Sequence, residues 1–263
     1  MSAKSPINRR TFIQAGTAAG AMAMTAKSYA QVAGANDRLR MGFIGCGGMA
    51  GGHLTTMLKI KDSENVDLVA VNDVYTKRAQ GFQDKIKEAG GDATLHNNYQ
   101  DILAREDIDY VLIATPEHSH AYITLEALDA GKHVYVEKPM THDIKEAQAV
   151  TEKVKQTGLK LQVGVQGTAD DSYSSAYEAI KAGKLVHAQI DYVRNYEGKG
   201  PWRRGGDPNA PKPADLDWDA WQKPAPIHEW DPSRYYEWRC FRDYSGGVAT
   251  DLFIHRLTRL IKA

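Results

Sequence analysis

A glycine-rich motif directly follows a short apolar segment near the start of the chain. Residues 39–44 have the character of a buried strand, and the pattern G-x-G-x-x-A follows them at once. In a dinucleotide-binding turn, Gly45 permits the sharp bend, Gly47 lets the backbone approach a pyrophosphate, and Ala50 lets helix and strand pack closely. A helix that begins here offers unpaired N–H groups to the phosphates. The motif predicts a cofactor-binding turn formed by Gly45, Gly47, Gly48, Met49 and Ala50.

The segments after this motif alternate between strand-like and helix-like character. We expect further strands at residues 66–71, 93–96, 110–114, 134–136 and 161–165. Helices are expected between them, at residues 53–59, 77–89, 99–104, 120–130 and 144–155. This alternation predicts βαβ units and an α/β fold with a doubly wound parallel sheet. We therefore place a Rossmann domain at residues 38–160 and a partial α+β substrate domain at residues 161–263.

An aspartate follows the second predicted strand. Asp73 lies 23 residues after Ala50, where a carboxylate can accept hydrogen bonds from the adenosine ribose hydroxyls. The same carboxylate would repel the 2′-phosphate of NADP, which favours NAD as the cofactor. NADP stays an alternative because Arg78 can reach adenine or a phosphate. The structural alternatives are a glycine-rich turn, a solvated aspartate and an exposed helix charge at Arg78.

Two later strand ends carry polar side chains. The run Thr115-Pro116-Glu117-His118-Ser119-His120 follows one strand, and Glu137-Lys138-Pro139 follows the next. In open parallel sheets, ligands bind outside the carboxyl ends of the strands. No further ligand pattern accompanies the two histidines, so we expect no metal site there.

These motifs together resemble the Gfo/Idh/MocA family, named for glucose–fructose oxidoreductase and inositol dehydrogenase. The glycine loop, Thr-Pro-x-His, Glu-Lys-Pro and an Asp251-x-x-x-His255 segment occur in the family's order and spacing over residues 38–260. The resemblance implies that Lys138 contacts nicotinamide ribose and substrate, and that Asp251 and His255 face it. It also places a small group beside the cofactor, with Gln166 at its border: Thr115, Pro116, His118, His120, Glu137, Lys138 and Gln166.

The resemblance implies proton and hydride transfer at a hydroxyl-bearing carbon. Residues four apart on a helix share a face, so Asp251 and His255 can point into one cleft. His255 would accept the hydroxyl proton, with Asp251 fixing the orientation of its ring. Lys138 would stabilise alkoxide character on the oxygen. Substrate contacts are expected from Lys138, Arg239, Asp251 and His255, although a surface helix pair and a solvated lysine are the plain structural alternatives.

The leading functional hypothesis is an NAD-dependent oxidoreductase acting on a sugar or cyclitol hydroxyl. The alternatives are an NAD-dependent, redox-neutral glycoside hydrolase and a truncated, non-catalytic nucleotide-binding protein. Thirty-three basic and 33 acidic residues cancel, so no overall positive field indicates nucleic acid. Cys46 and Cys240 suggest neither a disulfide framework nor a zinc site. A homo-oligomer is expected through the second-domain sheet if that sheet is complete.

The first thirty residues resemble a twin-arginine export signal. Arg9-Arg10 precedes an apolar run from Ala15 to Ala26, which is shorter than the ~20 residues that a membrane-spanning helix needs. Small residues up to Ala30 suit cleavage after that position. We expect export to the periplasm or another extracytoplasmic space, with a mobile alanine-rich helix as the alternative.

A tryptophan-rich segment at residues 198–238 interrupts the regular pattern. It holds all five tryptophans and seven of the ten prolines. Long ordered loops are commonly functional, and aromatic faces near Arg203, Arg204, Arg234 and Arg239 suit a carbohydrate. For Trp202 and Trp230, carbohydrate binding and local packing both stay open as roles, whereas Trp218 and Trp221 are expected to pack.

In the second domain, a strand is expected at 187–194 and one helix at 248–262. We expect a fragment or truncated gene, because no further strands follow.

Overall fold

The computed structural model describes residues 38–183, 189, 202 and 207–262. Within these residues, one parallel sheet has the order β3-β2-β1-β4-β5-β6. The strands are β1 (Leu39–Ile44), β2 (Val66–Asn72), β3 (Thr94–His96), β4 (Tyr110–Ile113), β5 (His133–Glu137) and β6 (Leu161–Gly164). The predicted export signal, the predicted strand at 187–194, Arg203 and Arg204 lie outside the described residues.

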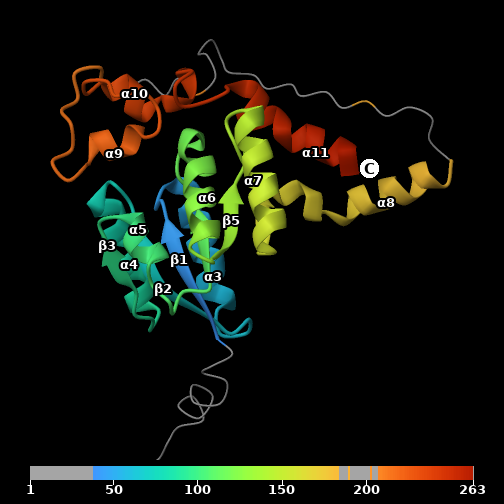
Figure 1. The fold of residues 1–263 in the computed structure, drawn as a ribbon, viewed down its shortest axis with the longest axis horizontal. Helices are drawn as coiled ribbons and strands as arrows, with labels where there is room; N and C mark the ends of the chain where they lie inside the picture. The colour runs from blue at the N-terminus through green and yellow to red at the C-terminus, as the bar shows by residue number, and fades with distance from the viewer. Residues whose placement is uncertain (1–37, 184–188, 190–201, 203–206, 263) are drawn as a thin grey trace, which may run out of the picture. The chain divides into compact units, whose positions relative to one another are not determined.

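The connections between the strands are the predicted helices: α3 (Gly48–Ile60), α4 (Thr76–Glu88), α5 (Tyr99–Leu103), α6 (His120–Asp129) and α7 (Ile144–Thr157) (Figure 1). The predicted α/β fold with a doubly wound sheet is confirmed. Helix α3 begins five residues earlier than predicted, because its first turns contain glycines that show no apolar periodicity. The sheet runs to Gly164, beyond the boundary expected after residue 160.

Alternate side chains of β1 enter two separate cores on opposite faces of the sheet. Met41 and Phe43 pack with residues of α3 and α4, and Ile44 packs with residues of α5 and α6. Gly42 faces the second core, where an added Cβ would lie 2.8 Å from the Cγ2 atom of Ile102. The last four residues of β1 are buried on both faces of the sheet, and none of them is polar. Its carboxyl end is thereby fixed at the centre of the sheet.

The chain after β6 forms short helices and turns. They are α8 (Asp171–Lys181), α9 (Trp218–Gln222), α10 (Pro232–Tyr236), a 3₁₀ turn η4 (Trp238–Cys240), a π-helical turn η5 (Ala249–Phe253) and α11 (Ile254–Lys262). The predicted helix over 248–262 is present, and residues 249–253 of it form a π-helical turn in place of regular α-helix. Lys138 donates a hydrogen bond to the Asp251 carbonyl within this turn, a tertiary contact that no periodicity pattern contains.

Aromatic side chains of the tryptophan-rich segment form a third core. Trp218 stacks on Trp221 with ring centroids 4.9 Å apart, which confirms that both pack. Trp230 packs against this aromatic cluster, and its indole N–H donates to the Ala210 carbonyl. Of the two roles considered for Trp230, carbohydrate binding and local packing, these contacts favour packing. Trp202 is half-buried.

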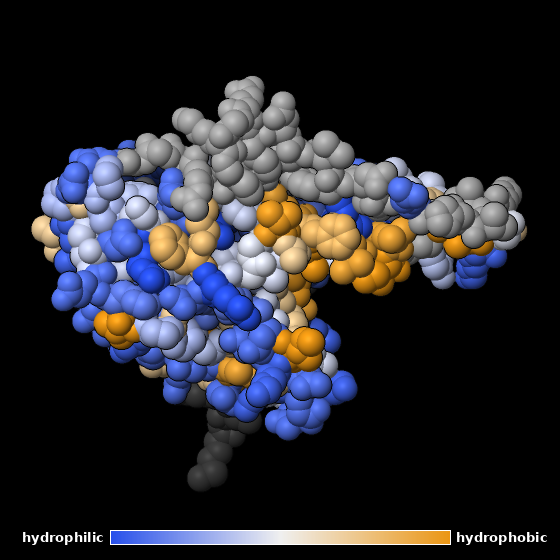
Figure 2. All heavy atoms as spheres, turned by 90° about the horizontal axis from the view of Figure 1, so that it is seen from above, coloured by the Kyte–Doolittle hydropathy of each residue, from blue (hydrophilic) through white to orange (hydrophobic). Residues whose placement is uncertain are grey.

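The chain from residue 248 onward keeps apolar side chains exposed. They are Val248, Phe253, Leu257, Leu260 and Ile261. Figure 2 shows hydrophobic side chains gathered on the side of the molecule where α8 and α11 lie. Among the described residues, no helix is both long and apolar enough to cross a membrane.

Candidate active site

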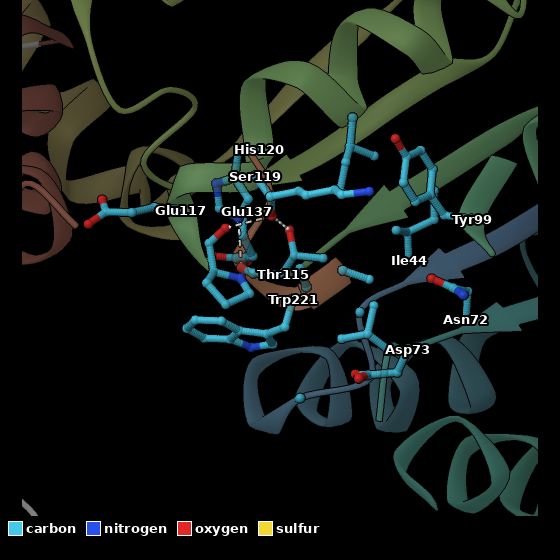
Figure 3. Close-up of a pocket in the computed structure, with 18 of the residues that line it drawn as sticks. Ile44, Asn72, Asp73, Tyr99, Thr115, Glu117, Ser119, His120, Glu137 and Trp221 are labelled. Atoms are coloured by element: carbon cyan, nitrogen blue, oxygen red, sulfur yellow. Dashed lines mark hydrogen bonds between the residues drawn. The ribbon is translucent and has the colours of Figure 1, made fainter. Parts of the chain in front are cut away.

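A pocket of about 790 Å³ opens at the carboxyl ends of β1, β2, β4 and β5. Figure 3 shows side chains from these strand ends converging on it, with Asp73 and Asn72 on one side and Thr115, Ser119 and His120 on another. This volume is in the range of small-molecule and cofactor sites, about 300–1,000 Å³. The sequence motifs that were far apart in the chain therefore line one cavity.

The glycine loop leaves room for a ligand at its centre. Gly45 has φ +88°, and a Cβ there would lie 2.8 Å from the Thr115 backbone nitrogen, so only glycine fits. At Gly47 and Gly48 an added Cβ would meet nothing within 4 Å. Gly47 precedes α3 without a side-chain cap, which leaves N–H groups of the first turn open to a ligand. These observations fit a pyrophosphate at the N-terminus of α3, and Met49 also lines the pocket.

Asp73 is fixed by the backbone around it. One carboxylate oxygen accepts a hydrogen bond from Cys46 N at 2.7 Å, and the other accepts one from Tyr75 N at 2.8 Å. Burial raises the pKa of Asp73, while these two hydrogen bonds and the Arg78 charge act in the opposite direction. A carboxylate has about four acceptor positions, so two remain for ribose hydroxyls. Asp73 thus secures the glycine loop and still faces the pocket.

The residues after β4 divide between the pocket and the aromatic core. Thr115, Pro116 and His120 line the pocket. His120 joins two loops, because its Nδ1 lies 2.6 Å from the Pro139 carbonyl and its Nε2 lies 2.8 Å from the Thr115 carbonyl.

His118 lies elsewhere. Its Nε2 is 2.9 Å from the Trp221 carbonyl, and its ring packs against the rings of Trp221 and Tyr244, which also contact each other. Burial lowers the pKa of His118 to about 4, so the ring is neutral at pH 7. The structure therefore places His118 in the aromatic core and away from the pocket lining, in contrast to the position beside nicotinamide that the resemblance implies.

Glu137 lines the pocket at the end of β5. Its Oε1 lies 2.7 Å from His53 Nε2 and accepts a hydrogen bond from Gln166 at 3.2 Å. Gln166 is exposed and is not part of the pocket lining. It acts here through Glu137, whose carboxylate it orients.

Lys138, Asp251 and the half-buried Arg239 form a charged group in the pocket wall. Lys138 Nζ donates to Asp251 Oδ1 at 2.6 Å and to the Asp251 carbonyl at 2.9 Å. Arg239 Nε lies 3.2 Å from the other carboxylate oxygen, and its guanidinium stacks on Trp238. Burial raises the pKa of Asp251, but Arg239 and Lys138 outweigh it and hold the pKa below its usual value. Asp251 is therefore ionised at neutral pH, and two cations surround it.

His255 does not have the partner that sequence reasoning expected. The Asp251 carboxylate pairs with Lys138 and Arg239. These contacts do not include the predicted pairing of Asp251 with the His255 imidazole. His255 is half-buried on α11 and is not in the pocket lining. Burial and the nearby Lys138 charge lower its pKa, which keeps the ring neutral at pH 7.

Sequence reasoning missed the part of the lining that comes from the tryptophan-rich segment. Asp217, Trp221, Tyr235 and Tyr236 all line the pocket, and Figure 3 shows the Trp221 ring beside Thr115. The signal in the sequence was the high tryptophan and proline content of that segment. The sequence analysis connected it with substrate binding or local packing, and not with the cofactor pocket. Among the described residues, no three metal-ligating side chains gather in one place.

Comparison with known proteins supports this geometry. The Gfo/Idh/MocA family model, described as an oxidoreductase family with an NAD-binding Rossmann fold, matches residues 39–165. A scyllo-inositol 2-dehydrogenase (NAD(+)) of Bacillus subtilis is 36% identical over 118 residues, which cover 45% of this chain and 33% of that protein. A glycosyl hydrolase family 109 protein of Shewanella baltica is 30% identical over 218 residues, 71% of this chain and 46% of the relative.

Among solved structures, apo scyllo-inositol dehydrogenase from Lactobacillus casei has a TM-score of 0.50 and 29% identity. The match covers 56% of this chain and 42% of that one. This chain spans less than half the length of each of these three proteins.

Proposed function

Because residues 39–165 belong to the Gfo/Idh/MocA oxidoreductase family and form its NAD-binding Rossmann fold, we propose that this protein is an NAD-dependent oxidoreductase acting on a sugar or cyclitol hydroxyl. The observation that carries the proposal is the position of Lys138. Its ammonium group, bound by Asp251, lies at the edge of the same pocket that the glycine loop lines.

The charged group at this edge suits the oxidation of an alcohol. Bound NAD supplies the hydride acceptor. Lys138 donates a hydrogen bond to the substrate oxygen and stabilises negative charge as its proton leaves. Asp251 and Arg239 hold the Lys138 ammonium in place. His255 is neutral at pH 7 and is the proposed proton acceptor, which requires the substrate to extend from the pocket towards α11.

The proposal is tested first by cofactor content and then by turnover. The purified protein is denatured, the released NAD(H) is assayed, and NAD reduction is followed with a panel of inositols and aldoses. We expect stoichiometric nucleotide and reduction with at least one polyol. A protein that neither contains nor binds NAD would refute the proposal.

A second candidate function is NAD-dependent, redox-neutral glycoside hydrolysis. It is favoured by the one observation that the family 109 relative aligns with 71% of this chain. It needs the same Lys138 and cofactor site. Release of an aryl alcohol from a synthetic glycoside, without net formation of NADH, would identify it.

Export through a twin-arginine signal in residues 1–30, and assembly through a second-domain sheet, are also part of the proposal. The Arg9-Arg10 motif supports export. A reporter fused after Ala30 should reach the periplasm, and Arg9→Lys/Arg10→Lys should retain it in the cytoplasm. Light scattering of the purified protein tests assembly.

A further inference from the structure

The pocket continues past Asp73 onto a part of its wall that the sequence motifs do not supply. The start of α5 and the outer side of α6 form this wall: Tyr99, Gln100, Tyr122, Ile123 and Glu126. The loop before α5 is held beside Asp73, because the side-chain amide of the preceding Asn72 donates to the carbonyls of His96 and Asn97 at 2.9 and 3.0 Å. Figure 3 shows Tyr99 on the same side of the pocket as Asn72.

A carboxylate and two aromatic rings give this wall its chemistry. The rings of Tyr99 and Tyr122 lie edge to face, with centroids 6.1 Å apart, and both side chains are half-buried. The Tyr99 hydroxyl donates to Glu126 Oε2 at 2.5 Å, and Gln100 Nε2 donates to the same oxygen at 3.4 Å. Glu126 is exposed, and none of the described residues donates to its Oε1. The carboxylate is thus held by one oxygen and can accept a hydrogen bond from a ligand with the other.

The position of this wall suits the base of a dinucleotide. A dinucleotide binds across the crevice where the strand order reverses, which here lies between β1 and β4. Asp73 at the end of β2 places the adenosine ribose on the β3 side of that crevice, while the glycine loop takes the pyrophosphate. The base attached to the ribose then lies towards α5 and α6. Aromatic side chains offer a surface on which a base can stack, and an ionised carboxylate accepts hydrogen bonds but donates none.

We propose that Glu126 is a base-specificity residue whose Oε1 accepts a hydrogen bond from the 6-amino group of the adenine of NAD. This inference rests on the proposed function, because it assumes that the pocket binds a nicotinamide dinucleotide. Hypoxanthine carries a carbonyl oxygen in place of the adenine amino group. Two acceptors would then face each other, so a dinucleotide that contains hypoxanthine should bind less tightly.

The test compares Glu126→Gln with Asp129→Asn. Asp129 is the last residue of the same helix, pairs with Lys153 at 2.6 Å and does not line the pocket, so its substitution removes the same charge away from the site. Dissociation constants for NAD and nicotinamide hypoxanthine dinucleotide are measured by calorimetry on full-length protein freed of nucleotide with charcoal. Thermal unfolding of each variant serves as the check on folding.

Wild type should bind NAD about 3–10-fold more tightly than the hypoxanthine dinucleotide, the effect of one hydrogen bond. In Glu126→Gln, the donors of Tyr99 and Gln100 hold the amide oxygen where Oε2 lies in wild type. The amide NH₂ group then faces the base, which suits the hypoxanthine carbonyl and not the adenine amino group. We expect Glu126→Gln to lose or reverse the preference for NAD, and Asp129→Asn to keep it.

Equal binding of the two dinucleotides by wild type, or an unchanged preference in Glu126→Gln, would overturn this inference and leave the proposed function in place. Loss of the preference in Asp129→Asn as well would show a general effect of charge and would also overturn it. A wild-type protein that binds neither dinucleotide would overturn the proposed function with it.

Discussion

Two glycines of the same loop should respond to alanine in opposite ways. At Gly45, alanine would have to adopt φ +88° with its Cβ 2.8 Å from Thr115 N and 2.9 Å from the Ala114 carbonyl carbon. A positive φ costs an L-residue about 1–2 kcal/mol, and overlap with atoms that cannot move aside adds about 1–3 kcal/mol. Loss of chain entropy in the unfolded state offsets about 0.4–1 kcal/mol. We expect Gly45→Ala to lower the free energy of unfolding by about 2–4 kcal/mol.

Gly47→Ala should preserve stability and weaken cofactor binding. Gly47 has φ −78° and ψ −170°, which alanine adopts readily, and an added Cβ would meet no protein atom within 4 Å. Alanine is a poorer N-cap than glycine, but the entropy gain offsets this, so the net change in unfolding free energy should be within about 0.5 kcal/mol. The new methyl group would lie where the pyrophosphate approaches the backbone. We expect at least a ~10-fold weaker NAD affinity, which is about 1.4 kcal/mol of binding free energy.

Both variants are compared by thermal unfolding without nucleotide and by calorimetric titration with NAD. For a domain of this size, about 2–4 °C of melting temperature corresponds to each kcal/mol, so Gly45→Ala should melt about 4–16 °C below wild type. Gly47→Ala should melt within about 2 °C of wild type. The reasoning is refuted if Gly45→Ala is as stable as wild type, or if Gly47→Ala binds NAD normally.

Three further substitutions test other parts of the site. Lys138→Met leaves a buried Asp251 carboxylate with Arg239 as its remaining cation; we expect about 3 kcal/mol of destabilisation in urea titrations and no detectable turnover. His118→Gln tests the buried neutral imidazole: the pKa is about 4 in the folded state and near 6.5 unfolded, so the unfolded state gains protons first as pH falls. Wild type should therefore lose about 2 kcal/mol more stability than His118→Gln between pH 7 and pH 5, and parallel pH profiles would contradict this. Asp73→Asn should weaken NAD binding about 10-fold in calorimetry while NADP binding weakens less; equal losses would show that Asp73 does not select the cofactor.

The parts of the site that sequence analysis located are those fixed by local motifs and by sheet topology. The glycine loop, Asp73 and Lys138 each follow a strand, and the carboxyl ends of parallel strands meet at one edge. Their common pocket was therefore predictable before any contact was known. The parallel direction of the strands follows from the predicted alternation of strands and helices, because parallel neighbours need a long crossover connection.

Other features depend on tertiary contacts that no local pattern contains. His118 and His120 are two residues apart, yet one is in the aromatic core and the other is beside the pocket. Tyr235 and Tyr236 are adjacent, but they are 4% and 45% exposed because only the first meets the tryptophan cluster. The pairing of Asp251 with Lys138 and Arg239, in place of His255, likewise depends on where η4 and η5 lie.

Because of the π-helical turn at Ala249–Phe253, the contacts of Lys138 depend on the number of residues in this segment as well as on their identity. A π turn closes over five residues where an α turn closes over four, so the turn holds one residue more than a regular helix would. Deleting a residue within it would restore regular α geometry and leave α11 facing nearly the same direction, because five π steps turn the chain about as far as four α steps. The Asp251 carbonyl would then take an ordinary place in the helix, and Lys138 would lose one of the two oxygens that it binds. Point substitutions in this turn should thus be tolerated more readily than a single-residue deletion.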